Sequence, residues 1–468
     1  MKNKNIFKGF TTCVVIASLM TTMSFPVLAE PIGPPPDSGN TEITSAAVYV
    51  KDNKYISEQS TQAAVSYGTV ADTFAKNIKI ISDTESSNGL YVTGSKSNYI
   101  LQNSKIMLSG NGSNDFAGVG AGAMVNGGGT LILKNANITT NGCIRSAVAA
   151  TDHSILKVYD STLISNGGTL PSDYQSKIGP GMMEPPEGLE VTGTARTCLT
   201  MNNSKSYYYN STIIADGWGA LSTDSAGGYV YLEANKCNIK TIKDGYGAYA
   251  DNGCHDVFND CKFNSAAMAV IMAGENDVTF KNTDATCGTY FAMMHCVMGS
   301  TSDKGTLNVT GGNIKTSDAA VLVKSDNADI IIDGARIVSK NGTLIKSIIN
   351  SDPNRTKVPT GETVYGIKAT LKNMVLQGNI LHEDTERSMS ITLMGTTLKG
   401  KIKDASIYID ADSKWIATED SNVVTLAGSF DVSKIDAVNG VTITATASSG
   451  CTLKGSYKLA SGGTLNVN

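Results

Sequence analysis

The chain has 468 residues, of which 17% are charged, and a formal net charge of −4 at pH 7. This mildly acidic balance, without any block of lysine or arginine, argues against nucleic acid as a partner. Beyond the N-terminal region, no segment approaches the roughly 18 apolar residues of a membrane span, so we expect no membrane helix.

Residues 1–29 have the pattern of a secretory signal peptide. A start rich in lysine precedes an apolar centre (13–23) and a small-residue cleavage site, Val27-Leu28-Ala29. Residues 30–44 are rich in proline and glycine at first and predict a flexible leader. We therefore expect a secreted, extracellular protein.

The cysteines leave two interpretations open. Of the nine, Cys13 lies in the signal peptide and the others would enter a compartment that permits disulfides. Cys237 and Cys261 occupy the same place in successive repeats, so they could bridge. Alternatively, most of the cysteines are small buried residues of the repeat.

A short pattern recurs along most of the chain with a period of about 24 residues. It begins with Asn or Asp at the start of a short strand, as in Asn103-Ser-Lys-Ile, Asn135-Ala-Asn-Ile, Asp160-Ser-Thr-Leu and Asn210-Ser-Thr-Ile. The segments alternate in polarity, contain β-branched residues and are separated by Gly, Asn, Asp and Ser, which excludes helical repeats. The period is too short for a propeller blade, so a parallel β-helix remains.

The domain boundaries follow the period. We expect the coil over residues 45–400, with an insertion at about 167–188, and irregular closing β turns over 401–468. The insertion is either a lid over the neighbouring strands or a passive surface loop.

Six segments of the middle turns can be superposed. They are Leu189–Gly193, Ala220–Asp224, Ala248–Asn252, Ala269–Ala273, Ala292–Cys296 and Ala320–Lys324. We expect the first and third residue of each to point into the coil and the second and fourth to point outward.

This repeat resembles the secreted right-handed parallel β-helix proteins of the pectate-lyase-like superfamily over most of residues 45–400. The resemblance implies an all-β solenoid of about 12–14 turns with capped ends. It also implies catalytic groups on the outward side of one row of strands. The specific motifs of polygalacturonases and pectate lyases are incomplete, so the resemblance concerns the fold and names no single activity.

The outward positions supply the candidate site. Because stacked turns lie about 5 Å apart, polar side chains of neighbouring turns converge there. The candidate catalytic residues are Arg196, Asp224, Asp251 and His295. The candidate substrate-binding residues are Glu190, Trp218, Tyr246, Tyr249, Asp152 and His153.

Each residue type suits a role on a polysaccharide. A pair of carboxyl groups can act as acid and base, or can hold Ca²⁺ against a uronate. Arginine binds a carboxylate with two hydrogen bonds, and aromatic rings stack on sugars. No cofactor is certain from the sequence, Ca²⁺ is possible, and the metal requirement stays open.

Two functions follow from these observations. In the first, the protein binds or cleaves a polysaccharide or cell-surface glycan, as a lyase or a glycoside hydrolase, along turns 189–296. In the second, it is a non-enzymatic surface or adhesive protein that docks a partner through the outward residues Leu221, Val270, Met272 and Met293. The sequence does not decide whether the protein is an enzyme.

Overall fold

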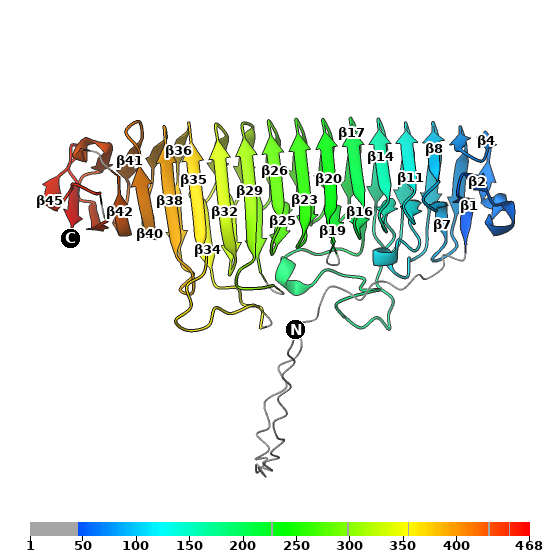
Figure 1. Cartoon of the computed structure of the whole chain (residues 1–468), viewed down its shortest axis with the longest axis horizontal. Coiled ribbons are helices and arrows are strands. Elements are labelled where there is room, and N and C mark those ends of the chain that lie inside the picture. The colour runs from blue at the N-terminus through cyan, green and yellow to red at the C-terminus, as the bar shows by residue number, and fades with distance from the viewer. Residues whose placement is uncertain (1–44, 226–227, 297–298, 354, 429–430, 449) are drawn as a thin grey trace, which may run out of the picture.

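The computed structural model describes residues 45–225, 228–296, 299–353, 355–428, 431–448 and 450–468. The expected signal peptide and leader lie outside these residues. The strands wind into one long coil in which strands of successive turns pair in parallel (Figure 1). This confirms the predicted single-stranded parallel β-helix. Within the described part of the chain, no helix is long and apolar enough to cross a membrane.

Each turn contributes up to three strands, which form three faces of the coil. The first face consists of β1 (Ala46–Lys51), β7 (Asn88–Thr93), β10 (Ala123–Asn126), β13 (Val148–Ala150), β16 (Arg196–Met201), β19 (Gly219–Asp224), β22 (Tyr246–Ala250), β25 (Met268–Ala273), β28 (Ala292–His295), β31 (Val321–Lys324), β34 (Thr343–Ile348) and β37 (Asn379–His382).

The second face follows the first within every turn. It consists of β5 (Phe74–Lys76), β8 (Asn98–Gln102), β11 (Thr130–Lys134), β14 (Ile155–Tyr159), β17 (Lys205–Tyr209), β20 (Val230–Asn235), β23 (Cys254–Asn259), β26 (Asp277–Lys281), β29 (Lys304–Thr310), β32 (Asn327–Asp333), β35 (Ile367–Lys372) and β38 (Met389–Met394). The long strand β40 (Ile402–Ile409) pairs with both β37 and β38, so the first two faces merge there.

The third face closes each turn. It consists of β6 (Lys79–Ser82), β9 (Lys105–Leu108), β12 (Asn137–Thr140), β15 (Thr162–Ser165), β18 (Thr212–Ala215), β21 (Asn238–Thr241), β24 (Lys262–Ser265), β27 (Asp284–Cys287), β30 (Asn313–Thr316), β33 (Arg336–Ser339), β36 (Val375–Gln377), β39 (Thr397–Lys399), β41 (Lys414–Ala417) and β43 (Ile435–Ala437).

Short irregular elements occupy the two ends of the coil. The N-terminal end has β2 (Lys54–Tyr55), η1 (Ser57–Gln59), η2 (Gln62–Ala64), β3 (Val65–Ser66) and β4 (Thr69–Val70). The C-terminal end has β42 (Ser421–Ala427), η5 (Val432–Lys434), β44 (Thr442–Ala447), β45 (Gly455–Lys458) and β46 (Thr464–Val467). Antiparallel pairs β1–β2 and β45–β46 interrupt the parallel stacking at these ends, where an open strand edge would otherwise invite further chains.

The recurring Asn and Asp residues form the corner between the second and third faces. Asn103, Asn135, Asp160 and Asn210 all have φ between 47° and 51°, in the left-handed region that Asn and Asp tolerate better than other residues with a side chain. Each backbone N–H donates to a carbonyl oxygen of the next turn, as from Asn135 to Tyr159 at 3.0 Å. The period in the sequence is therefore the period of this corner.

The register of the first face differs from the superposition expected from the sequence. In the structure, one row of paired residues contains Leu221, Ala248, Val270 and Ala292. The superposition expected Ala220 in the place of Leu221 and Ala269 in the place of Val270. The expected alignment is wrong by one residue in three of the six segments, those starting at Ala220, Ala269 and Ala320. A shift of one residue turns every side chain to the opposite side of a strand.

This shift changes which apolar residues face outward. Leu221, Val270 and Met272 belong to the core inside the coil, contrary to expectation. Met293 faces outward as expected, since it belongs to a separate apolar cluster outside the coil. The segment Leu189–Gly193 is not a strand either: Glu187–Leu189 forms the 3-10 helix η4, and the strand of that turn is β16.

The cysteines are all free in the described residues, and seven of the eight are buried. Cys237 and Cys261 lie on successive turns, and their thiol groups donate to backbone carbonyl oxygens, Cys237 to Asn235 at 3.4 Å and Cys261 to Ala234 and Asn259 at 3.3 Å. The structure therefore fits the interpretation of cysteines as small buried residues of the coil.

We expect Leu221→Ala to lower the free energy of unfolding by about 2–5 kcal/mol, because it leaves a cavity in the core. The control Val375→Ala, at a side chain that is 88% exposed, should change it by less than about 0.5 kcal/mol. Urea denaturation measures both. Equal losses in the two variants would contradict the observed register.

Asp256 is a carboxyl group inside the coil. Oδ1 accepts a hydrogen bond from the Thr223 hydroxyl at 3.0 Å, and Oδ2 contacts no donor among the described residues. Burial raises the pKa of Asp256 well above its ordinary value. The folded protein therefore binds a proton at Asp256 that the unfolded chain releases as pH rises through about 4.

We accordingly expect Asp256 to make the protein less stable as pH rises from about 4 toward its folded pKa, because there the folded state holds more protons than the unfolded state. Asp256→Asn should flatten this part of the pH dependence, measured as urea midpoints from about pH 4 to 8. The exposed corner variant Asp260→Asn serves as control. An unchanged slope in Asp256→Asn would show that this carboxyl group is ionised in the fold.

Candidate functional site

The insertion between β15 and β16, residues 166–195, packs on the outward side of the first face. Met182, Leu189 and Val191 of the insertion are buried in an apolar cluster that is separate from the core of the coil. From the strands, this outer cluster includes Leu199, Ile271, Met293 and Leu322. Of the two expectations for the insertion, a covering segment is therefore the one that the packing supports. It protrudes from the same edge of the coil as the loop 349–366 (Figure 1).

An ion pair between a buried lysine and an exposed glutamate holds the C-terminal end of the insertion. The Lys324 ammonium group lies 2.5 Å from Oε1 of Glu190 and 3.3 Å from the Gly188 carbonyl oxygen. The Lys324 side chain is only 4% exposed. Glu190, which the sequence suggests for substrate binding, thus holds the insertion against β31.

His295 lies beside Lys324 in the register of the first face and is also covered. Neither ring nitrogen has a hydrogen-bond partner among the described residues. Burial, and then the charge of Lys324, lower the pKa of His295 to about 3. The imidazole is therefore neutral near pH 7, and its catalytic role stays a prediction that this geometry does not favour.

Arg196, at the start of β16, pairs with the buried carboxyl group of Asp115. Its Nε and Nη2 atoms donate to Oδ2 of Asp115 at 3.0 and 2.9 Å, and the rings of Phe116 and Trp218 flank the guanidinium. Asp115 lies in η3 (Asp115–Ala117), in the connection between β9 and β10. The Arg196 side chain is 3% exposed, so it is not open to a substrate carboxylate.

The electrostatics of this pair follow from its burial. Burial by itself would lower the pKa of Arg196, but the neighbouring carboxyl group of Asp115 outweighs this effect and the net pKa is raised. Burial raises the pKa of Asp115 in spite of Arg196. Both guanidinium hydrogen bonds end on Oδ2 of Asp115, and the contact is an ion pair.

The aromatic residues expected to stack on sugars are also covered. Trp218 and Tyr246 are each 1% exposed and belong to the outer cluster. The Tyr246 hydroxyl lies 3.0 Å from Oγ of Ser222. A Cβ atom at Gly219 would lie 2.0 Å from the Tyr246 ring, which explains the glycine that follows Trp218.

Asp224 and Asp251 converge as the sequence predicts. Asp224 ends β19 and Asp251 directly follows β22, on adjacent turns, and their carboxyl groups are hydrogen-bonded. Burial, and next the charge of Asp224, raise the pKa of Asp251 well above its ordinary value. Two neighbouring carboxyl groups resist being ionised together, so the pair favours holding a proton.

The surroundings of this pair combine partial exposure with a nearby cation. Both aspartates are partly exposed, unlike Asp115 and Arg196. Nη1 of Arg196 lies 3.9 Å from Oδ2 of Asp224. Tyr249 precedes Asp251 by two residues, and burial, followed by the charge of Asp251, raises the pKa of its phenol well above the ordinary value. Asp224, Asp251 and Tyr249 thus form a polar group at the border of the outer cluster.

Asp152 and His153 do not join this group. They form the exposed corner between β13 and β14, two turns before β19, with φ of 53° and 61°. Nδ1 of His153 lies 3.1 Å from Oδ1 of Asp152. No group of three or more His, Cys, Asp or Glu side chains in the described residues is arranged to hold a metal ion. The Ca²⁺ suggested by the sequence stays a prediction.

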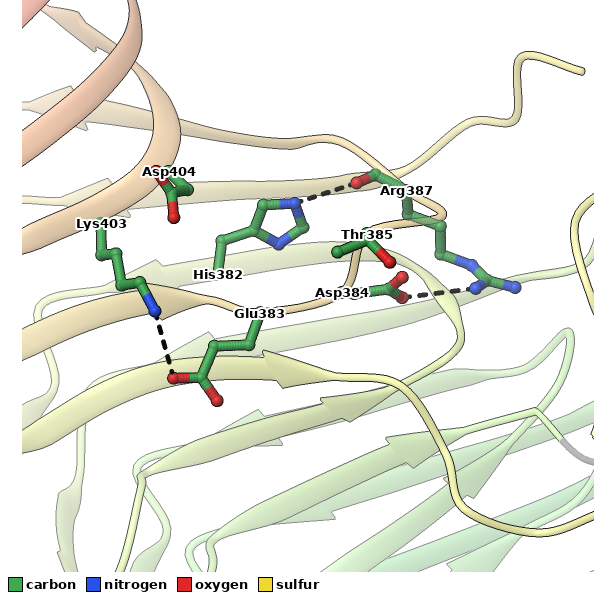
Figure 2. A pocket seen from close by; sticks show the side chains of 7 residues that line it. All are labelled: His382, Glu383, Asp384, Thr385, Arg387, Lys403 and Asp404. Carbon is green, nitrogen blue, oxygen red and sulfur yellow. Dashed lines mark hydrogen bonds and ion pairs between the residues drawn. The ribbon is translucent and has the colours of Figure 1, made fainter. Parts of the chain in front are cut away.

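A depression lies farther along the first face, away from the aspartate pair. It has a volume of about 630 Å³ and is lined by His382, Glu383, Asp384, Thr385, Arg387, Lys403 and Asp404 (Figure 2). Its charges are largely paired within it, as between Lys403 and Glu383 at 3.6 Å and between Arg387 and Asp384 at 3.3 Å.

A serine beside this depression is not accessible. Oγ of Ser347 lies 2.6 Å from Nδ1 of His382, whose Nε2 lies 2.9 Å from the Arg387 carbonyl oxygen. Ser347 is fully buried, so a substrate cannot reach its hydroxyl. The depression is therefore a weaker candidate site than the aspartate pair.

No protein-family model matches the chain, and no curated protein matches it by sequence.

We expect Arg196→Met to lower the free energy of unfolding by about 3–5 kcal/mol, because it leaves the buried Asp115 carboxyl group without its partner. Adding Asp115→Leu to this variant should recover part of the loss. The matched control is Lys243→Met, which removes an ion pair to Asp216 whose lysine side chain is 77% exposed, and it should cost less than about 1 kcal/mol. Equal losses from Arg196→Met and Lys243→Met would contradict a structural role for Arg196.

Proposed function

We propose that this protein is a secreted polysaccharide-cleaving enzyme whose acid and base are the carboxyl groups of Asp224 and Asp251. The observation that carries the proposal is that two partly exposed carboxyl groups meet on the outward side of the first face, where the pKa of Asp251 is raised. A carboxylate and a carboxylic acid in contact supply a proton acceptor and a proton donor at one place.

The fold supports a polymeric substrate. The coil offers a long face on which a chain molecule can contact several turns at once. In the pectate-lyase-like superfamily, which the sequence resembles, the catalytic groups lie on the outward side of one such face. The aspartate pair also lies on the outward side of a face, which supports the proposal.

The short separation within the pair favours elimination over hydrolysis. Glycoside hydrolases need their two carboxyl groups about 5 Å apart or more, to leave room for a sugar carbon or a water molecule. We take Asp224 and Asp251 to be closer than that, because their carboxyl groups interact directly across adjacent turns. In elimination, the carboxylate takes the C5 proton of a uronate, the C4–O bond breaks as the C4–C5 double bond forms, and the carboxylic acid protonates the leaving oxygen.

Asp251→Asn and Asp224→Asn should each lower the rate of release of unsaturated uronate by about 100-fold or more, because the pair then lacks its base or its acid. Absorbance of the unsaturated product and reducing ends would be followed on polygalacturonate, alginate and neutral polymers, with and without Ca²⁺. Asp152→Asn, at an exposed corner, is the control.

The wild-type rate should peak where the pair holds one proton and fall on either side, as both groups become protonated or both become ionised. Reducing ends without unsaturation would replace elimination with hydrolysis. Absence of products from every polymer would contradict the enzymatic function.

One observation favours a second candidate, a non-enzymatic adhesive protein. The outward apolar residues Ile271, Met293 and Leu322 follow one another on successive turns and form a strip within the outer cluster. A partner that displaces the insertion would gain this strip. Such binding would survive Asp251→Asn, whereas cleavage would not.

A further inference from the structure

A second surface with its own chemistry lies on the outward side of the second face, on the strands β11, β14 and β17 (Figure 1). On successive turns, Tyr159 pairs with Lys134 on one side and with Tyr209 on the other. Two residues earlier in β14, Lys157 pairs with Tyr207. Lys205 begins β17 on the same side. We call these six residues the tyrosine–lysine surface. None of them belongs to the aspartate pair or to the outer cluster.

The tyrosines are held in fixed positions by one another and by their neighbours. The rings of Tyr159 and Tyr209 stack with centroids 5.0 Å apart and planes 10° apart, and Tyr207 packs on Tyr231 at 5.7 Å. The three tyrosines of the surface are half-buried, so their ring edges reach solvent. Their hydroxyl groups make no hydrogen bond with any other described residue, which leaves three donors available at the surface.

The lysines give this surface a positive charge on an acidic protein. Lys134, Lys157 and Lys205 form no ion pair with the described residues, and Lys134 and Lys205 are exposed. Glu233, in register with Tyr207 on the next turn, is the acidic neighbour. Its carboxylate accepts hydrogen bonds from the Tyr231 hydroxyl and the Asn235 amide group at 2.9 and 2.8 Å and keeps its charge, so the three lysines outnumber one carboxylate. The chain as a whole carries −4, so the charge here opposes the average.

We infer that the tyrosine–lysine surface binds an acidic, uronate-bearing polysaccharide chain. Phenol hydroxyls and ammonium groups that repeat on turns about 4.8 Å apart match a polymer that carries a carboxylate and several hydroxyl groups on each unit. The stacked rings keep the donors in place before the polymer arrives, which lowers the entropic cost of binding. A flat, open strand surface also accepts an extended chain without rearrangement.

This surface is distinct from the proposed catalytic pair and shares with it only the class of polymer. It would keep a polymer on the coil while the pair acts on another stretch of the same chain, so that binding at two places raises the local concentration of substrate. The binding surface and the enzymatic proposal can therefore fail independently.

The test measures binding of polygalacturonate and alginate by affinity electrophoresis and calorimetry, in an Asp251→Asn background in which we expect degradation to be at least about 100-fold slower. Lys157→Ala/Lys205→Ala should weaken binding about tenfold or more, and Tyr207→Phe/Tyr209→Phe, which keeps the rings and removes the hydroxyls, should weaken it by several-fold. Lys281→Ala/Lys372→Ala, on the same face beyond the tyrosines, is the control matched in charge and should bind like its parent.

Several outcomes would overturn the inference. Equal weakening by the control pair would indicate a non-specific charge effect. Binding of neutral dextran or of single-stranded DNA as tightly as polyuronate would assign the surface to another partner. Undiminished binding in the lysine and tyrosine variants, with unchanged thermal unfolding, would leave the tyrosine stack as a structural feature only.

Discussion

Parallel stacking of equivalent residues on successive turns is the constraint on which the rest of the structure depends. Backbone hydrogen bonds between turns fix which residues pair on successive turns. Because side chains alternate along each strand, every row of paired residues points either into the coil or outward. The core and both candidate surfaces result from this division. A single residue of register decides whether Leu221 supports the core or faces outward.

Stacking also creates the candidate chemistry. Asp224 and Asp251 are 27 positions apart in the sequence. They meet because each lies at the end of the first-face strand of its turn, and the two turns are adjacent. Burial, and next the charge of Asp224, raise the pKa of Asp251, so the stacked pair favours holding a proton. The same geometry, applied to Tyr159 and Tyr209, yields a ring stack on the second face. Different residue types in equivalent columns thus give the two faces different chemistry.

The insertion changes what the first face can offer. Without it, Trp218, Tyr246 and the outer apolar residues would face solvent, as the sequence suggests for a working surface. Met182, Leu189 and Val191 cover them, and the Glu190–Lys324 pair fastens the covering segment across 134 positions of the chain. Asp224, Asp251 and Tyr249 lie at the border of this covered region and stay partly exposed.

The sequence by itself determined the repeat, the parallel β-helix, the place of the insertion and the convergence of Asp224 with Asp251. These follow from local features: left-handed corner residues with a regular period, and alternation within short strands. Only the tertiary structure decided the register, the burial of Arg196, Trp218 and His295, and the partners Asp115 and Lys324. Small apolar residues such as Ala220 and Ala269 fit either side of a strand, so composition cannot fix the register. Asp115 lies in a connection outside the repeat, and its contact with Arg196 arises only when the coil brings distant turns together.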